Sequence, residues 1–169
     1  MVYSFENASF RDKETGLYSE AYFMEVFYRE WHRMIRENHA LSILVVHPNL
    51  DMMNPTGKQK FLQLAHLIDA STKRTTDLVS RFHNNEFIVG LFDLSCEGTT
   101  TIINRILSAI SEQNEQQQVT NCSAFIGGLN VHPTRDLDIC KVLEQVESLT
   151  TFNARQSQAE NAFELQTLN

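Results

Sequence analysis

The residues best placed for chemistry stand on a short polar corner, His83-Asn84-Asn85, which Glu86 follows directly. Two apolar runs, Leu78–Phe82 and Glu86–Phe92, flank this corner and are rich in the Val, Ile, Leu and Phe that favour strands. Because His and Asn tolerate the backbone angles of tight turns, the stretch predicts a β-hairpin. The hairpin would hold its corner rigidly, and the Glu86 carboxylate there can help to hold a hydroxyl group of a ligand.

Two motifs resemble those of the GGDEF domains, the diguanylate cyclase family. The family's hairpin signature, Arg-x-Gly-Gly-Asp/Glu-Glu-Phe, is similar to Arg81-Phe82-His83-Asn84-Asn85-Glu86-Phe87, which departs from it at the three residues of the tip. The family's N-terminal motif resembles Asp12-x-x-Thr15-Gly16-Leu17, although Ser19 stands where the family has Asn. The resemblance implies a degenerate GGDEF domain of bacterial second-messenger signalling.

The resemblance also implies which positions would serve catalysis. An active member joins two GTP molecules and needs oxygen ligands for divalent ions. Those ligands map to His47 and Asn85, neither of which is acidic, and Glu86 alone remains of the acidic pair. The two signature glycines, which let phosphates approach the backbone, map to His83 and Asn84, whose side chains would crowd that approach. We predict that the chain has lost Mg²⁺ binding and diguanylate cyclase activity and that it needs no cofactor.

One binding motif of the family is present at the family's spacing. Arg74 and Asp77 form the Arg-x-x-Asp pattern of the product-binding inhibitory site, five residues ahead of the signature glycine positions. An Arg fork can donate to guanine O6 and N7, and an Asp can accept from guanine N1 and N2. The ligand that this implies is cyclic di-GMP. The alternative is that the two residues only end a helix and start a strand.

Three further positions could contribute to binding. Asn54 and Gln59 fall near the positions where the family reads a guanine base, so they are candidates for nucleotide binding together with Glu86. The loop before Gln59 is shorter than in active members, and an ordinary loop Asn is the competing interpretation of Asn54. His47 and His83 with Glu86 would also form a two-His, one-carboxylate metal site, if the fold brought them together.

The elements that must position these residues follow from hydrophobic periodicity. Apolar residues at helical spacing predict four helices, over about 18–38, from Phe61 to about Thr72, over 102–110 and over 137–152. A polar linker, Ser111–Gln118, is predicted to follow the third helix. Continuous or alternating apolar runs predict strands at 41–46, at both arms of the hairpin, at 119–131 and at 161–165. The first of these strands should end near His47-Pro48. The order predicts an α+β fold with a ferredoxin-like βαββαβ core, an extra N-terminal helix and a C-terminal helix and strand, as in nucleotidyl cyclases.

The composition excludes several classes of protein. At 169 residues, with 42% hydrophobic residues, we expect one domain over 1–169, of which 1–10 are an extension or linker remnant. The net charge of −7 makes a nucleic-acid partner improbable, and no apolar run is long enough for membrane insertion. The three cysteines form no Cys-x-x-Cys pair, which favours a reducing, cytoplasmic location.

Three functions agree with these observations. The first is a catalytically inactive GGDEF signalling protein that acts as a cyclic di-GMP receptor or as a regulatory module with a protein partner, and that can form a dimer. The second has no nucleotide role: His83-x-x-Glu86-Phe87 resembles the altered signature of GGDEF/EAL-type regulators of small-RNA decay, although no EAL domain is present. The third is a sensor that binds GTP with residual or no turnover.

Overall fold

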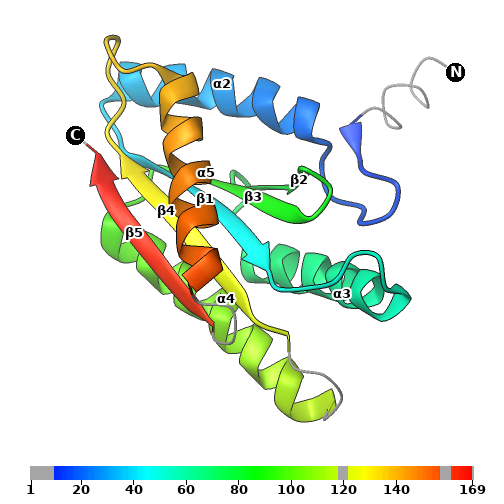
Figure 1. Cartoon of the computed structure of the whole chain (residues 1–169). Helices are drawn as coiled ribbons and strands as arrows, with labels where there is room; N and C mark the ends of the chain where they lie inside the picture. Colours follow the sequence, from blue (N-terminus) through cyan, green and yellow to red (C-terminus); the bar gives the residue numbers. More distant parts are fainter. Residues whose placement is uncertain (1–9, 118–121, 157–160, 169) are drawn as a thin grey trace, which may run out of the picture.

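A five-stranded mixed sheet with helices on both faces forms the molecule. The computed structural model describes residues 10–117, 122–156 and 161–168 (Figure 1). The elements run in the order α2 (Glu20–Glu37), β1 (Leu41–Pro48), α3 (Pro55–Ser71), β2 (Leu78–Phe82), β3 (Glu86–Phe92), α4 (Cys96–Gln117), β4 (Ala124–Val131), α5 (Ile139–Gln156) and β5 (Ala162–Leu168).

The strands lie in the order β2-β3-β1-β4-β5. All neighbours are antiparallel except β4 and β5, which are parallel and are joined by α5. The elements from β1 to β4 thus form the predicted βαββαβ core, to which α2, α5 and β5 are added, and the predicted fold class is confirmed.

Each face of the sheet buries its own apolar core. Along β1, Leu44 and Val46 join the cluster beneath α3 and α4, whereas Ile43 and Val45 join the cluster beneath α2 and α5. This alternation follows from the two-residue period of a strand. A continuous apolar run is what a strand covered on both faces requires, and Figure 1 shows the helices on both sides of the sheet.

Two predicted boundaries are wrong. The predicted linker Ser111–Gln118 continues α4 as far as Gln117, because Glu and Gln are good helix formers even where the apolar stripe has ended. Asn114 also ties this turn to the next segment through hydrogen bonds with the backbone N–H and C=O of Cys122. The strand predicted from Val119 begins at Ala124, and residues 118–121 lie outside the described part of the chain.

The other predicted elements are close to those observed. Ser19 is the N-cap of α2, and its side chain accepts from the N–H of Tyr22. Phe23, Phe27 and Trp31 are buried core residues of that helix. Within the described residues, no helix combines the length and the apolar character needed to cross a membrane.

A close approach of α5 to the sheet gives a test of the packing. A Cβ atom at Gly127 of β4 would lie 2.1 Å from Oγ1 of Thr150, which is buried and donates to the carbonyl of Val146. We expect Gly127→Ala to lower the free energy of unfolding by about 1–3 kcal/mol, because α5 must shift to relieve the clash. Urea denaturation measures this change. Gly98→Ala is the control, because a Cβ there lies close only to the flexible Leu94 side chain and makes an ordinary contact with Oγ of Ser95; equal losses in both variants would contradict the packing.

Candidate functional site

The hairpin tip has the backbone geometry that the sequence predicts. Phe82 pairs with Glu86, and between them His83 and Asn84 have φ angles of 50° and 68°. These angles lie in the left-handed region, which Gly adopts freely and which Asn and His tolerate better than other residues. The turn therefore keeps a glycine-like backbone while its residues carry side chains.

Arg81 connects the hairpin to the N-terminal motif. Its Nε donates to the carbonyl of Asn84 at 3.0 Å, and its Nη1 lies 3.5 Å from Asp12 Oδ2 and 3.2 Å from Glu14 Oε1. Its guanidinium carbon also lies 5.0 Å from the ring centre of Phe61. The two motifs that resemble the family are thus in direct contact, although they lie far apart in the sequence.

Asp12 is the centre of this contact. Its Oδ2 accepts from both the backbone N–H and the hydroxyl of Thr15, at 2.9 and 2.7 Å. Partial burial alone would raise the pKa of Asp12, but the hydrogen bonds from Thr15 and the charge of Arg81 together lower this pKa below its ordinary value. The folded protein therefore favours the ionised carboxylate.

This lowered pKa predicts how stability depends on pH. The contribution of Asp12 is complete above its unfolded pKa and is lost as the pH falls through the lower pKa of the folded state. We expect Asp12→Asn to lower the free energy of unfolding by about 1–2 kcal/mol at pH 7 and by less at acid pH. Urea denaturation at several pH values measures the difference. The exposed Asp136→Asn is the control; a pH-independent effect of Asp12→Asn would refute the assignment.

His47 and Glu86 form a cross-strand pair. Nδ1 of His47 lies 2.9 Å from Oε2 of Glu86, next to the Val46–Phe87 pair in the β1–β3 register. The Glu86 side chain is only 12% exposed, so its carboxylate needs a partner, and the imidazole provides one. At one of the two positions that the resemblance assigns to the metal, a histidine thus holds the remaining carboxylate.

Asn85 does not join this pair. It is exposed and lines a cavity of about 400 Å³ together with Met52, which precedes α3, and with Lys58 and Phe61 of α3. His47 instead lines a cavity of about 240 Å³ with Phe125 and the α5 residues Thr151 and Arg155. The two positions predicted to have lost their metal ligands therefore lie beside different cavities.

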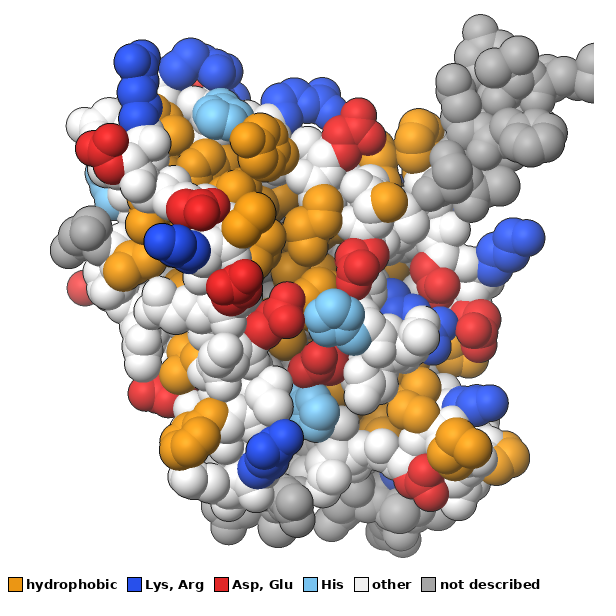
Figure 2. Space-filling view, turned by 45° about the horizontal axis from the view of Figure 1, so that its top comes forward, with side chains coloured by type: hydrophobic (Ala, Val, Ile, Leu, Met, Phe, Trp, Pro, Cys, Tyr) orange, Lys and Arg blue, Asp and Glu red, His pale blue; other side chains and the backbone are white. Residues whose placement is uncertain are grey.

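His83 contacts acidic residues of α2 and α5. Its backbone N–H donates to Oε1 of Glu20 at 3.3 Å, and its Nε2 lies 3.5 Å from Oε2 of Glu147 on α5. Figure 2 shows acidic side chains gathered around histidines on one face of the molecule. In the parts of the chain that the structure describes, no three His, Cys, Asp or Glu side chains lie close enough to hold a metal ion, so the two-His, one-carboxylate site does not form.

The two candidates for recognition of a guanine base, Asn54 and Gln59, lie at the N-terminal end of α3. Asn54 is the N-cap of α3, where its Oδ1 accepts from the N–H of Thr56 at 2.9 Å and Pro55 follows it. Gln59 is exposed on the same helix. The competing interpretation of Asn54 as a local structural residue therefore accounts for its side chain.

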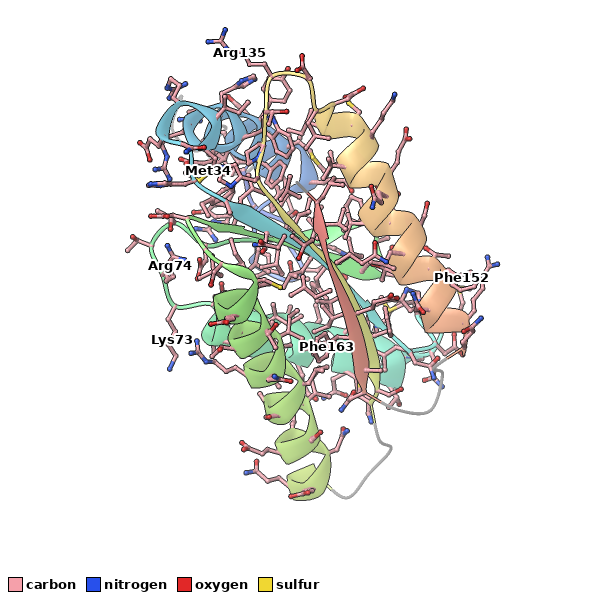
Figure 3. The ribbon with its side chains drawn as sticks, turned by 90° about the vertical axis from the view of Figure 1, so that its left-hand side faces the viewer. Met34, Lys73, Arg74, Arg135, Phe152 and Phe163 are labelled. Carbon is pink, nitrogen blue, oxygen red and sulfur yellow. The ribbon has the colours of Figure 1, made fainter. Side chains whose placement is uncertain are left out.

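Arg74 and Asp77 lie in the same turn between α3 and β2. Oδ2 of Asp77 accepts from the backbone N–H of Arg74 at 3.0 Å, whereas its Oδ1 is buried and has no hydrogen-bond partner among the described residues. The Arg74 side chain is exposed and makes no hydrogen bond or ion pair within the described part of the chain (Figure 3). The pair is thus not a guanidinium–carboxylate salt bridge.

A third charged residue at this turn was not predicted. Arg105 of α4 donates from Nη1 to the carbonyl of Ser71 at 3.2 Å. Burial raises the pKa of Asp77, and the backbone N–H of Arg74 and the charges of Arg74 and Arg105 partly oppose this rise. The only signal in the sequence was a basic residue between the apolar residues of α4, which by itself marks an ordinary exposed helix position.

Comparisons with known proteins agree with this geometry. The family model "Diguanylate cyclase, GGDEF domain" matches residues 9–160, and no curated protein matches the chain. A GGDEF domain of DgcB from Caulobacter crescentus, in complex with c-di-GMP, has a TM-score of 0.78 at 14% identity, covering 93% of this chain and 95% of that chain. The GGDEF domain of YfiN, or TpbB, from Pseudomonas aeruginosa has a TM-score of 0.76 at 20% identity, covering 92% and 93%.

The diguanylate cyclase SiaD from Pseudomonas aeruginosa, in complex with its activator SiaC, is also similar in structure. Its TM-score is 0.78 at 14% identity over 97% of this chain, which spans 64% of the SiaD chain. At these identities the solved structures show a common fold. The match of the family model over most of the chain shows more, namely that this protein belongs to the GGDEF family.

Proposed function

We propose that this GGDEF domain does not synthesise cyclic di-GMP but binds it, at the site formed by Arg74, Asp77 and Arg105. The observation that carries the proposal is the state of this turn among the described residues: the exposed Arg74 guanidinium has no partner there, and one oxygen of the Asp77 carboxylate is unbonded. A buried polar atom without a partner costs free energy, so a ligand that opens the turn and donates to this oxygen would recover that cost.

The chemistry of the turn fits a guanine base. A guanidinium can donate two parallel hydrogen bonds to O6 and N7, and a carboxylate can accept from N1 and N2. Arg105 adds a second positive charge near Asp77, which suits the phosphates of a cyclic dinucleotide. That a GGDEF domain of DgcB was solved in complex with c-di-GMP supports the choice of ligand.

The loss of synthesis rests on the pair formed by His47 and Glu86. Magnesium prefers carboxylate, carbonyl and water oxygens, and a phosphoryl-transfer site needs such an ion to neutralise the developing charge. Here an imidazole nitrogen occupies the place of one oxygen ligand and binds the remaining carboxylate at 2.9 Å.

We also infer a protein partner, since the similar cyclase SiaD forms a complex with its activator SiaC.

The alternative of a GTP sensor is less well supported, because the Asn54 amide oxygen on which it depends already caps α3. Isothermal titration calorimetry separates the ligands: we expect heat of binding with cyclic di-GMP, and a flat trace would remove the proposal. The raised pKa of Asp77 adds a second criterion. Since only the ionised carboxylate can accept both guanine donors, binding should weaken as the pH is lowered toward the aspartate range.

A further inference from the structure

The two edges of the sheet differ in how they are covered. On the outer side of β2, Tyr18 forms a bridge with Ser80, and its N–H donates to the carbonyl of Val79 at 3.3 Å. On the outer side of β5, no strand or bridge pairs with the backbone in the described part of the chain. Figure 3 looks onto this edge, where β5 stands in front between α4 and α5. An edge strand left open in this way is a template for pairing with another chain.

The register of β5 shows which backbone groups point outward. β5 is parallel to β4, and the carbonyl of Leu168 accepts from the N–H of His132 at 3.1 Å. In a parallel pair, alternate residues direct both backbone groups toward the neighbouring strand. The even-numbered residues of β5 therefore face β4. The outward N–H and C=O groups belong to Phe163, Leu165 and Thr167.

Nothing in β5 blunts this edge. Proteins usually protect open edges with Lys, Pro or a bulge. The seven residues of β5 include no Pro, Lys or Arg, and the single charge, Glu164, is bound by Asn153 of α5, whose Nδ2 donates to Oε2 at 2.8 Å. The edge thus keeps its pairing groups available.

We propose that this edge pairs with β5 of a second copy, antiparallel and about a two-fold axis at Leu165. In this register Leu165 faces itself and Phe163 faces Thr167, so these pairs join residues whose backbone groups point outward. Such residues form the hydrogen-bonded pairs of an antiparallel ladder. Glu164 then stands opposite Gln166 of the second copy. Within one chain the Gln166 amide already donates to Oε1 of Glu164 at 3.4 Å, and in the dimer it can donate to the facing carboxylate instead. An axis at Glu164 would instead place two like charges together, and this charge pattern selects a second copy in the stated register.

Apolar side chains flank the same edge. Phe163 is 37% exposed, and Phe152 of α5 is 64% exposed (Figure 3). Phe152 directly precedes Asn153, which contacts Glu164 one residue from the proposed axis. Exposed aromatic residues thus occur both on β5 and on the helix that packs beside it. This surface does not depend on cyclic di-GMP binding.

The first test removes one outward N–H. Sedimentation of the full chain, from micromolar protein to about 1 mM, should show a concentration-dependent dimer. Thr167→Pro should be monomeric, since proline removes an outward donor and leaves the β4 ladder intact. Thr167→Ala keeps that donor and should remain dimeric; circular dichroism confirms that both variants fold. A wild-type monomer at every concentration, or a Thr167→Pro dimer as strong as wild type, would overturn the proposal.

The second test checks the register without altering the backbone. In the proposed register, residue 166 of each copy faces Glu164 of the other copy. Gln166→Lys therefore creates two pairs of opposite charge, whereas Gln166→Glu creates two pairs of like charge. We expect the dimer dissociation constant to fall about tenfold in the first variant and to rise about tenfold in the second, with both changes shrinking at high salt. Equal dissociation constants in the two variants would refute the register, and capture of a different protein's strand in place of a second copy would refute self-pairing.

Discussion

Arg74→Ala is expected to weaken cyclic di-GMP binding by about 10- to 100-fold. A fork of two hydrogen bonds to a guanine edge contributes about 1–3 kcal/mol. Its removal also takes away one of the two positive side chains, Arg74 and Arg105, that act on the Asp77 carboxylate. The guanidinium of Arg74 is exposed and unpaired within the described residues, so the substitution breaks no internal contact. Calorimetric titration of the variant measures the loss.

A matched control separates recognition from overall charge. Arg135 is exposed in the connection between β4 and α5, and Arg135→Ala removes the same charge far from Arg74 (Figure 3). We expect its affinity for cyclic di-GMP to remain within about twofold of wild type, because exposed charges beyond a Debye length are screened. If both variants lost affinity equally, or if neither did, the turn would not be the binding site.

Restoring carboxylates should restore magnesium binding. His47→Asp places a new carboxylate beside Glu86 and removes the imidazole that now holds it, and Asn85→Asp adds a second carboxylate at the exposed hairpin tip. We expect the double variant to bind Mg²⁺ at least about tenfold more tightly than wild type, since hard cations select clustered oxygen ligands. Calorimetry with MgCl₂ measures this gain.

The control adds the same charges elsewhere. His66 and Asn104 are exposed on α3 and α4, and His66→Asp with Asn104→Asp changes the net charge equally without building a cluster. A gain of Mg²⁺ affinity in this control would show a general charge effect. The absence of any gain in the His47→Asp/Asn85→Asp variant would show that the chain has lost more of the site than its charges.

The fold could be predicted from the sequence where local signals agree with packing. The continuous apolar run of β1, the stripe that includes Phe23 and Phe27, and the polar corner at His83 each correspond to an observed element. The end of α4 could not be predicted in this way. Its last turns have no apolar stripe, and they are held by helix propensity and by the contact between Asn114 and Cys122.

The site was harder to predict because its contacts cross the fold. The resemblance pointed to Arg74, Asp77 and Glu86, but the partnership of Glu86 with His47 depends on the β1–β3 register. The nearness of Arg105 to Asp77 depends on how α4 packs beside the α3–β2 turn. The orientation of His83 toward Glu20 and Glu147 depends on two helices that the hairpin sequence does not contain. Side-chain direction and tertiary neighbours, rather than local pattern, decide these features.

Incubation of the purified protein with GTP and Mg²⁺, followed by chromatographic detection of cyclic di-GMP, tests the central claim most directly. A domain whose remaining carboxylate is held by His47 should yield no product above the background of uncatalysed GTP. Sustained formation of the cyclic dinucleotide over many turnovers would show instead that the histidine at position 47 does not replace the metal, and the proposed function would be wrong.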